Sequence, residues 1–332
     1  MSSPSAQTLL DLEQLLVAPK AADRGRRAWE LVTRAQGNPD FHVVLDFATD
    51  KELVVPCGVA DPKREPNLTW TNPLDGSEMV WIPPGKFRVG PDKDVVELGG
   101  FSLSKHPVTN GQFGEFIRGK AYASHESAET DQSDEGEYQN GELLQHWSEY
   151  DGPPLNKTDH PVVFVSYLDA LAYCEWAGLS IPGEFMWEKA ARGTDGRTFP
   201  WGEDAPQKHQ RVSSGRYQRV ATHGHYLATE TTEVGKLPQV RSPYGCEQMA
   251  GNVSTWCQPG DPTNAGEFPP ARPKPKMPTA RKPVQAAVRG GAFKRQGVQT
   301  LRTFHRRNLS VIRRNDWVGI RPACFLPVRP AE

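Results

Sequence analysis

Apolar residues along this chain occur in short runs, which predict brief strands and few helices. Phe101 and Leu103 alternate with polar residues, as in a strand with one buried face, and Pro107 ends that strand. The runs VRGGAF at residues 288–293 and WVGIRPACF at residues 317–325 predict two further strands that are buried. The sequence therefore predicts a core built partly from short strands, with much of the chain in loops.

Two helices are predicted where a polar residue precedes an amphipathic pattern. Thr109 or Asn110 begins the first helix, and Ser166 begins the second, which Gly178 ends. The buried side of the first is predicted to carry Phe113, Phe116 and Ile117. The buried side of the second is predicted to carry Ala170, Leu171, Tyr173, Cys174 and Trp176. Each helix is therefore expected to cover the core with one face.

Residues 1–70 have a different pattern. Leucines between residues 9 and 17 and apolar positions within residues 24–34 predict two amphipathic helices, and FHVVLDF and ELVVPCGV predict two short strands. Two interpretations remain open for this segment. It is either an N-terminal helical extension packed on the main domain or a separate module that binds a second partner.

Composition indicates a loop-rich globular protein. Its 332 residues include 30 glycines and 30 prolines. The five cysteines form no C-x-x-C pair, the N-terminus lacks the apolar core of a signal peptide, and no apolar run is long enough to span a membrane. We therefore expect a cytoplasmic protein with free thiols and no membrane contact.

Charge is unevenly distributed. Residues 271–332 hold fifteen lysines and arginines against two acids, whereas the whole chain has a net charge of −1. Residues 123–159 form an acidic insertion with ten acids and one lysine, and residues 259–283 form a Pro/Lys-rich loop that is expected to be extended and exposed. The asymmetry favours an anionic or carboxylate-bearing partner at the C-terminal face. Pairing of this face with the acidic insertion is the alternative.

The basic residues concentrate between the two C-terminal strands. Residues 293–317 interleave basic side chains with Phe293, Phe304 and Trp317. Residues 294–316 show neither a helical nor a strand period, so most of this segment is predicted to be loop. A loop of this length in a compact domain is usually functional or disordered, and its apolar flanks favour an ordered, functional one.

Several motifs in this chain resemble those of the formylglycine-generating-enzyme (sulfatase-modifying factor) family, over residues 77–326. The matching segments, in order, are MVWIPPGKF at 79–87, FSLSKHPVTN at 101–110, IPGEFMWEKAARG at 181–193 with FPWG at 199–202, YGCEQMAGNVSTW at 244–256, RGGAF at 289–293, and LRTFHR at 301–306 with RNDWVGIR at 314–321. The resemblance implies an α+β, loop-rich variant of the C-type lectin fold, with the N-terminal segment as a small extension.

The oxidase members of this family hold copper through two cysteines between the diglycine and the later arginine. The matching positions here fall near Val298 and Thr303, or near Thr300 and His305, and residues 258–323 contain no cysteine. Because a thiolate pair is the soft ligand set that binds Cu(I), we expect no formylglycine formation and no catalytic residue. Cys324 is predicted to be a small buried side chain in a strand.

Other metals of the family are weakly supported. His223 and His225 form the only close histidine pair and are weak candidates for an iron or copper site. The resemblance places a calcium site near Gly251 and Val253, whose carbonyls remain available, but Gln248 and Thr255 replace the expected ligands. We therefore expect no resident cofactor.

The remaining chemistry is recognition. Arg302, Arg306, Arg314 and Arg321 match framework positions of the signature and are expected to pair with buried carboxylates such as Glu184 or Glu188, or with backbone carbonyls. The other polar and aromatic side chains of this segment are predicted to form a ligand face. They are Lys294, Arg295, Gln296, Gln299, Thr303, His305, Arg307, Asn308, Arg313, Asn315, Asp316 and Trp317.

Three functions stay open on the sequence. The favoured one is a catalytically inactive, formylglycine-generating-enzyme-like protein that binds a protein or peptide through the C-terminal face. The first alternative is an oxygen-dependent iron or copper oxidoreductase with a metal site built from His223, His225 or His305. The second is a structural subunit of a larger assembly. Nucleic acid is not expected, because no nucleic-acid motif is present and the rest of the chain is acidic.

Overall fold

The computed structural model describes residues 69–72, 74–120, 147, 156–205, 230–258, 284–293 and 298–324. The expectations for residues 1–68, for nearly all of the acidic insertion and for the loop at 259–283 fall outside these residues. None of the helices within the described ranges is long and apolar enough to cross a membrane.

The described residues form two four-stranded sheets and a separate hairpin. The first sheet has the order β1-β2-β5-β10 and is antiparallel throughout. Its strands are β1 (Thr69–Thr71), β2 (Glu78–Ile82), β5 (Phe101–Ser104) and β10 (Ala323–Cys324). The hairpin pairs β3 (Gly85–Val89) with β4 (Asp94–Leu98).

The second sheet is C-terminal and has the order β8-β7-β6-β9. Its strands are β6 (Ser254–Cys257), β7 (Gln285–Arg289), β8 (Arg306–Ser310) and β9 (Val318–Gly319). The β6–β9 pair is parallel and the other two pairs are antiparallel. The predicted strands around the diglycine and at the end of the domain are thereby confirmed, as is the buried position of Cys324 in β10.

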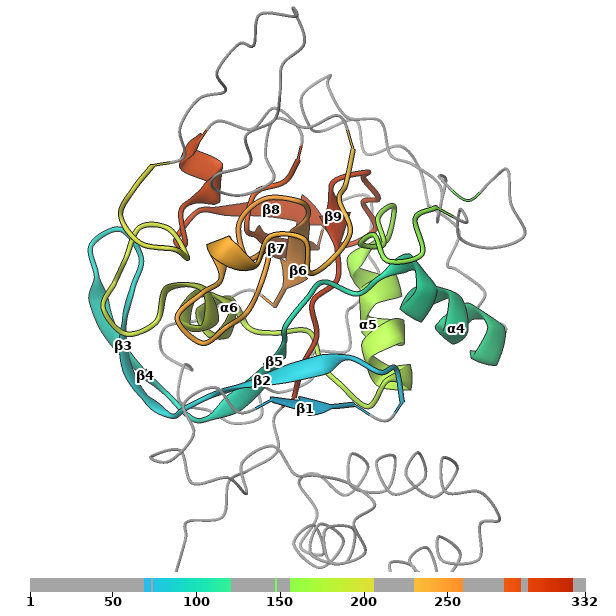
Figure 1. The fold of residues 1–332 in the computed structure, drawn as a ribbon, viewed down its shortest axis with the longest axis horizontal. Coiled ribbons are helices and arrows are strands. Elements are labelled where there is room, and N and C mark those ends of the chain that lie inside the picture. Colours follow the sequence, from blue (N-terminus) through green and yellow to red (C-terminus); the bar gives the residue numbers. More distant parts are fainter. Residues whose placement is uncertain are drawn as a thin grey trace, which may run out of the picture.

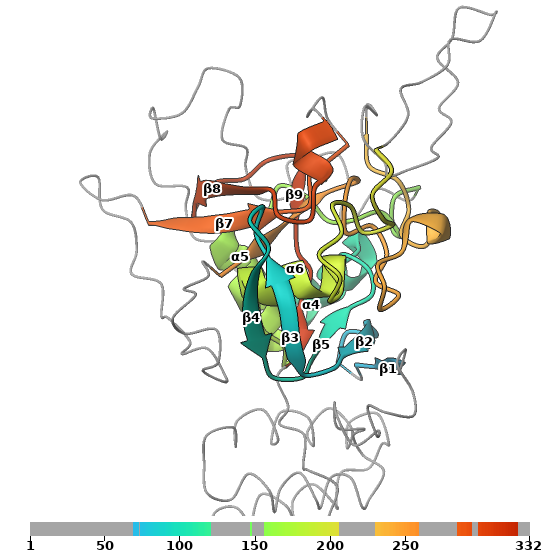
Figure 2. The same cartoon turned by 90° about the vertical axis from the view of Figure 1, so that its left-hand side faces the viewer.

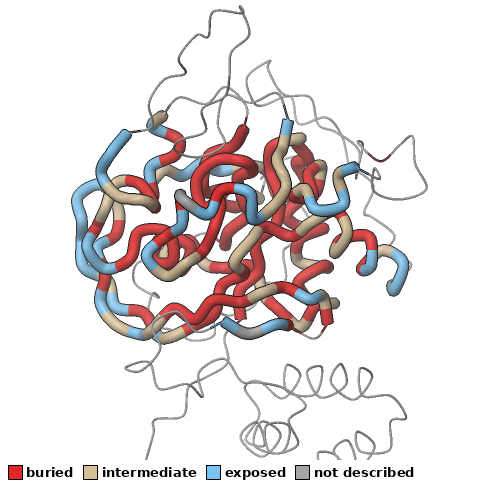
Figure 3. Tube along the Cα trace, viewed as in Figure 1, coloured by how far each residue is buried: buried red, intermediate tan, exposed pale blue. Residues whose placement is uncertain are grey.

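Three α-helices and two short 3₁₀ helices complete the described structure. They are α4 (Asn110–Lys120), α5 (Tyr167–Trp176), α6 (Glu184–Arg192), η2 (Pro238–Val240) and η4 (Val298–Leu301). Helix α6 lies between the two sheets and contacts β3, β5 and β7, while α4 and α5 pack together to one side (Figures 1 and 2). Buried residues therefore concentrate around α6 and α5, and exposed ones follow the β3–β4 hairpin at the rim (Figure 3).

Local signals explain where the helices begin. The Ser166 hydroxyl accepts a hydrogen bond from the Asp169 amide, and the Asp169 carboxylate accepts one from the Ser166 amide, which completes a capping box. At α4 the Thr109 hydroxyl accepts from the Gln112 amide at 3.2 Å, so Thr109 caps this helix. Gly178 follows α5 in a left-handed conformation, as predicted.

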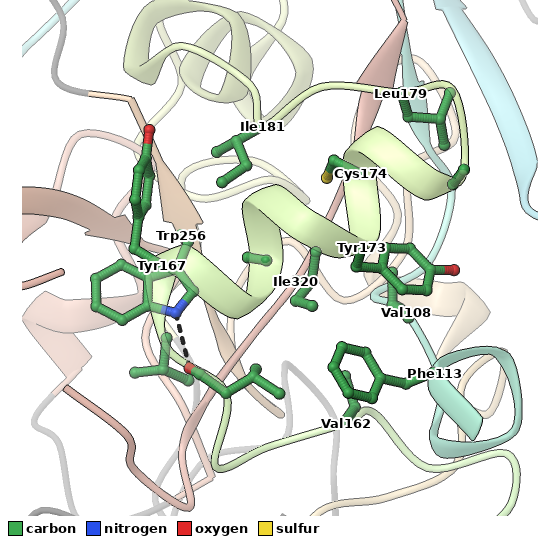
Figure 4. Close-up of a cluster of buried hydrophobic side chains, with 14 of the residues drawn as sticks. Val108, Phe113, Val162, Tyr167, Tyr173, Cys174, Leu179, Ile181, Trp256 and Ile320 are labelled. Carbon is green, nitrogen blue, oxygen red and sulfur yellow. Dashed lines mark hydrogen bonds between the residues drawn. The ribbon is translucent and has the colours of Figure 1, made fainter. Parts of the chain in front are cut away.

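Helix α5 anchors the larger part of the core. Tyr173 stacks on Phe113 of α4 with ring centroids 5.6 Å apart. On the other side of the helix, the Trp256 indole donates to the Val165 carbonyl at 3.0 Å (Figure 4). This buried hydrogen bond joins the segment before α5 to strand β6 of the C-terminal sheet.

The structure places a strand within the basic segment. Most of residues 294–316 is predicted to be loop, and within this range Arg306–Ser310 forms β8 and pairs with all of β7. Arg306, Arg307 and Asn308 are exposed, so the strand lacks the apolar alternation that would have indicated it. The basic segment is therefore partly built into the C-terminal sheet.

Candidate functional site

The basic segment leaves strand β7 through the diglycine Gly290-Gly291. Gly290 has a φ of +102° and Gly291 a φ of +62°. Residues with a Cβ rarely adopt these backbone conformations. The Gly290 carbonyl accepts a hydrogen bond from the Gly251 amide at 2.8 Å. The two glycines therefore turn the chain sharply where it crosses the loop before β6.

Beneath this turn, helix α6 carries two buried acids, Glu184 and Glu188, one turn apart. Arg289 of β7 reaches both of them, at 3.3 Å from Glu184 and 2.6 Å from Glu188. Arg306 of β8 binds Glu184 through hydrogen bonds of 2.7 and 2.8 Å, and Arg192 of α6 binds Glu188 at 2.7 Å. Three guanidinium groups thus share two carboxylates and hold β7 and β8 against α6.

The other signature arginines have distinct positions. Arg314 binds the buried Asp169 carboxylate at 2.9 Å, and Arg321 donates to four backbone carbonyls at 2.6–3.1 Å. Burial lowers the pKa of Arg321 to about 10. Arg302 differs, because it is exposed and lies over the Phe304 ring at 5.9 Å. The predicted pairing with carboxylates or carbonyls is confirmed for Arg306, Arg314 and Arg321. It is not observed for Arg302 within the described residues.

The positions that match the family's copper-binding cysteines are occupied by other groups. Val298 and Thr300 lie in η4, and Thr300 is buried. The buried Thr303 hydroxyl donates to the Arg197 carbonyl at 2.9 Å, so it serves the packing of this segment. His305, half-buried, is the one imidazole among these positions.

The four cysteines that the structure describes are free and buried: Cys174, Cys246, Cys257 and Cys324. Burial raises the pKa of Cys246 to about 11 and also raises those of Cys174 and Cys257. Because the thiolate is the form that binds metal or reacts, these three side chains are held in their inert form.

The turn that resembles the family's calcium site is held together by its own amides. Gln248 donates to the Glu233 carbonyl at 2.9 Å and accepts from the Asn252 amide at 3.0 Å. The Thr255 hydroxyl accepts from the Trp187 indole at 3.1 Å. The side chains that replace the expected ligands therefore already have protein partners, while Gly251 and Val253 are buried within this turn.

Histidine ligands gain no support from the described residues. His223 and His225 lie outside them. Within the part of the chain that the structure describes, no group of three or more His, Cys, Asp or Glu side chains could hold a metal ion.

The predicted ligand face divides by burial. Lys294, Arg295 and Gln296 lie outside the described residues. Four of its members are buried: Thr303, Arg313, Asn315 and Trp317. His305 and Asp316 are half-buried, and Gln299, Arg307 and Asn308 are exposed. The buried four serve the interior of the domain, so an accessible face is narrower than the sequence predicted.

The accessible residues gather on strand β8 and the turn before it. We call this exposed part of the chain, which includes both sides of the strand, the β8 face and define it as Arg302, Phe304, His305, Arg307 and Asn308. Two guanidinium groups lie over the Phe304 ring, that of Arg302 at 5.9 Å and that of buried Arg192 at 5.3 Å from the ring centroid. Arg307 lies over the buried Trp317 ring at 5.9 Å. Each exposed arginine therefore makes a cation–π contact, which does not occupy its N–H groups.

His305 is predicted to stay neutral at physiological pH. Burial, and then the charges of Arg307, Arg289 and Arg302, lower the pKa of His305 to about 4 from an ordinary value of about 6.5. The unfolded chain therefore binds this proton at a higher pH than the folded chain. The contribution of neutral His305 to the free energy of unfolding is therefore complete above about pH 6.5 and is lost as the pH falls toward 4.

An NMR titration of the His305 imidazole should show a midpoint near pH 4. In His305→Asn the free energy of unfolding should depend less on pH between about 4 and 6.5. A midpoint at the ordinary value, with unchanged pH dependence in the variant, would contradict the environment described here.

Comparison with known proteins agrees with this geometry. The model of the sulfatase-modifying factor enzyme 1-like domain matches residues 66–324. The chain is 31% identical over 259 residues to the formylglycine-generating enzyme of Thermomonospora curvata, covering 65% of this chain and 82% of that one. It is 30% identical over 212 residues to the inactive Cα-formylglycine-generating enzyme 2 of Bos taurus, covering 54% and 69%.

A solved structure shows the same fold. PvdO from Pseudomonas aeruginosa superposes with a TM-score of 0.54 at 21% identity, over 79% of this chain and all of that one. The motifs, the α+β architecture and the family match coincide over the same residues. This protein belongs to the family with a sulfatase-modifying factor enzyme 1-like domain.

Proposed function

We propose that this protein is a catalytically silent member of its family that binds a protein or peptide partner through the β8 face. The observation that carries the proposal is the pair of exposed arginines, Arg302 and Arg307, on this face. Each lies over an aromatic ring, and neither has an ion pair within the described part of the chain. An exposed guanidinium that lacks an internal acid suits a carboxylate from a partner.

The same region supports the absence of oxidase chemistry in this proposal. The positions that correspond to the copper-binding cysteines carry Val298, Thr300, Thr303 or His305, and the described thiols are buried. Relatives of this family include a protein named as inactive, from Bos taurus. The fold still presents an exposed surface when other residues replace the catalytic cysteines. We place the function on that surface.

Affinity capture with charge-reversed variants tests the proposal. The bait would be the full chain, as wild type and as Arg302→Glu with Arg307→Glu. Proteins retained from a native lysate by the wild type should be retained at least about tenfold less by the double variant, because like charges would then face the partner's carboxylates.

A matched control changes net charge equally at another surface. Arg118 and Lys236 have side chains that are 59% and 64% exposed, and each forms a surface ion pair with a neighbouring acid. Arg118→Glu with Lys236→Glu should leave the captured protein unchanged. Equal capture by the β8-face variant and by wild type, with both variants folded, would overturn the proposed function.

A further inference from the structure

Strand β8 ends the C-terminal sheet. The order β8-β7-β6-β9 leaves β8 with one neighbour, β7, and Figure 2 shows β8 at the outer side of that sheet. The backbone groups on its other side are therefore available wherever they point away from β7.

The register identifies which groups those are. Val311 donates to the Val284 carbonyl at 3.0 Å, and the β7–β8 pairing continues this register through Arg307 opposite Val288. Hydrogen-bonded and non-hydrogen-bonded pairs alternate in an antiparallel ladder, so Leu309 and Arg307 face β7. Residues 306, 308 and 310 consequently direct their N–H and C=O groups outward.

The structure agrees with this assignment. The Ser310 carbonyl accepts from Arg313 rather than from β7. For Arg306 and Asn308, no described residue outside the ladder hydrogen-bonds to the backbone. Two residues spaced two apart thus present the donor and acceptor pattern that an added strand requires.

The charge around this edge selects the kind of strand. Arg306 is already neutralised by Glu184, whereas Arg302 and Arg307 lack an ion-pair partner among the described residues. Like charges directly opposite one another destabilise strand pairing, so Arg307 disfavours a second copy of β8. Acidic side chains on an added strand would instead meet these two guanidinium groups.

We propose that the outer edge of β8 accepts an extended, acidic segment of a partner protein as an added strand. This inference rests on the proposed function and names its binding mode and partner chemistry. Main-chain hydrogen bonds to Arg306 and Asn308 would supply affinity, and the exposed arginines would select for glutamate and aspartate.

Selection from a random-peptide display library tests the binding mode, because it does not require an identified partner. Peptides retained by the full chain should be enriched in acidic residues. Their binding should be at least about tenfold weaker in Asn308→Pro, which removes the backbone amide, than in Asn308→Ala, which also lacks the Asn308 side chain but keeps that amide. Proline is tolerated here because the lost N–H points away from β7.

A second measurement does not depend on the proline variant. Addition of a selected peptide to wild-type protein should slow hydrogen exchange at the amides of Arg306 and Asn308, followed by NMR. The β7-facing amides of Arg307 and Leu309 should change less, because they are already bonded.

The outcomes separate the two proposals. Acidic peptides that require Arg302 and Arg307 but bind Asn308→Pro normally, without protecting the outward amides, would overturn strand addition and leave the proposed function standing. Selection of no acidic peptide, or binding unaffected by charge reversal, would overturn both. Outward amides that already exchange slowly in the protein alone would show that this chain occupies its own edge, which would overturn an external partner.

Discussion

Glu188→Ala is expected to lower the free energy of unfolding by about 3–5 kcal/mol, because it leaves two buried guanidinium groups undercompensated. Glu188 accepts from Arg192 at 2.7 Å and from Arg289 at 2.6 Å. These three side chains are no more than 3% exposed. It also accepts from the Gly90 amide at 2.7 Å, so the substitution removes a contact to the β3–β4 hairpin as well.

Urea unfolding followed by tryptophan fluorescence would measure this loss. Glu115→Ala provides the control, because the Glu115 side chain is 67% exposed in a surface pair with Arg118. This substitution should lower the free energy of unfolding by less than about 1 kcal/mol. Similar losses in the two variants would mean that the network is not a structural link between α6 and β7.

Gly290→Ala is expected to lower the free energy of unfolding by about 3–5 kcal/mol, because it combines backbone strain with a steric clash. A Cβ at this position would lie 2.8 Å from the Met249 carbonyl oxygen and 3.0 Å from the Trp187 ring. Neither neighbour can move easily, because one is backbone and the other is a buried indole. The φ of +102° adds strain that alanine cannot relieve.

Gly76→Ala separates these two causes. Gly76 also has a positive φ, of +72°, but a Cβ there would meet nothing within 4 Å. Its substitution should cost about 1 kcal/mol, from backbone strain alone. If chemical denaturation gave equal losses at the two glycines, the close approach of the diglycine to the loop before β6 would have no energetic consequence.

Local signals in the sequence predicted the parts of the fold that local interactions determine. The Ser166 cap, the buried faces of α4 and α5 and the strand around the diglycine all follow from neighbouring residues. Pairings over long sequence separations were harder. Glu184 was expected as an arginine partner, but Asp169, which binds Arg314 across 145 residues, was not, because no neighbouring residue indicates that pairing.

The candidate site was predicted as a segment rather than as a surface. Composition identified the basic and aromatic residues, but it does not determine which of them point inward. Trp317 and Asn315 are buried next to β9, whose pairing with β6 joins segments more than sixty residues apart in the sequence and has no local signal. Strand β8 was not predicted, because an edge strand with polar residues on both faces has no apolar period.

The pairing of β10 with β5 has a consequence for synthesis. Strand β5 ends at residue 104, and its second neighbour begins at residue 323, so one edge of β5 lacks this partner until more than two hundred further residues have been translated. Arg321, which donates to the carbonyls of Ser104 and Lys105, arrives equally late. The nascent domain must therefore protect an apolar strand edge throughout its translation, a period in which association with other chains competes with folding.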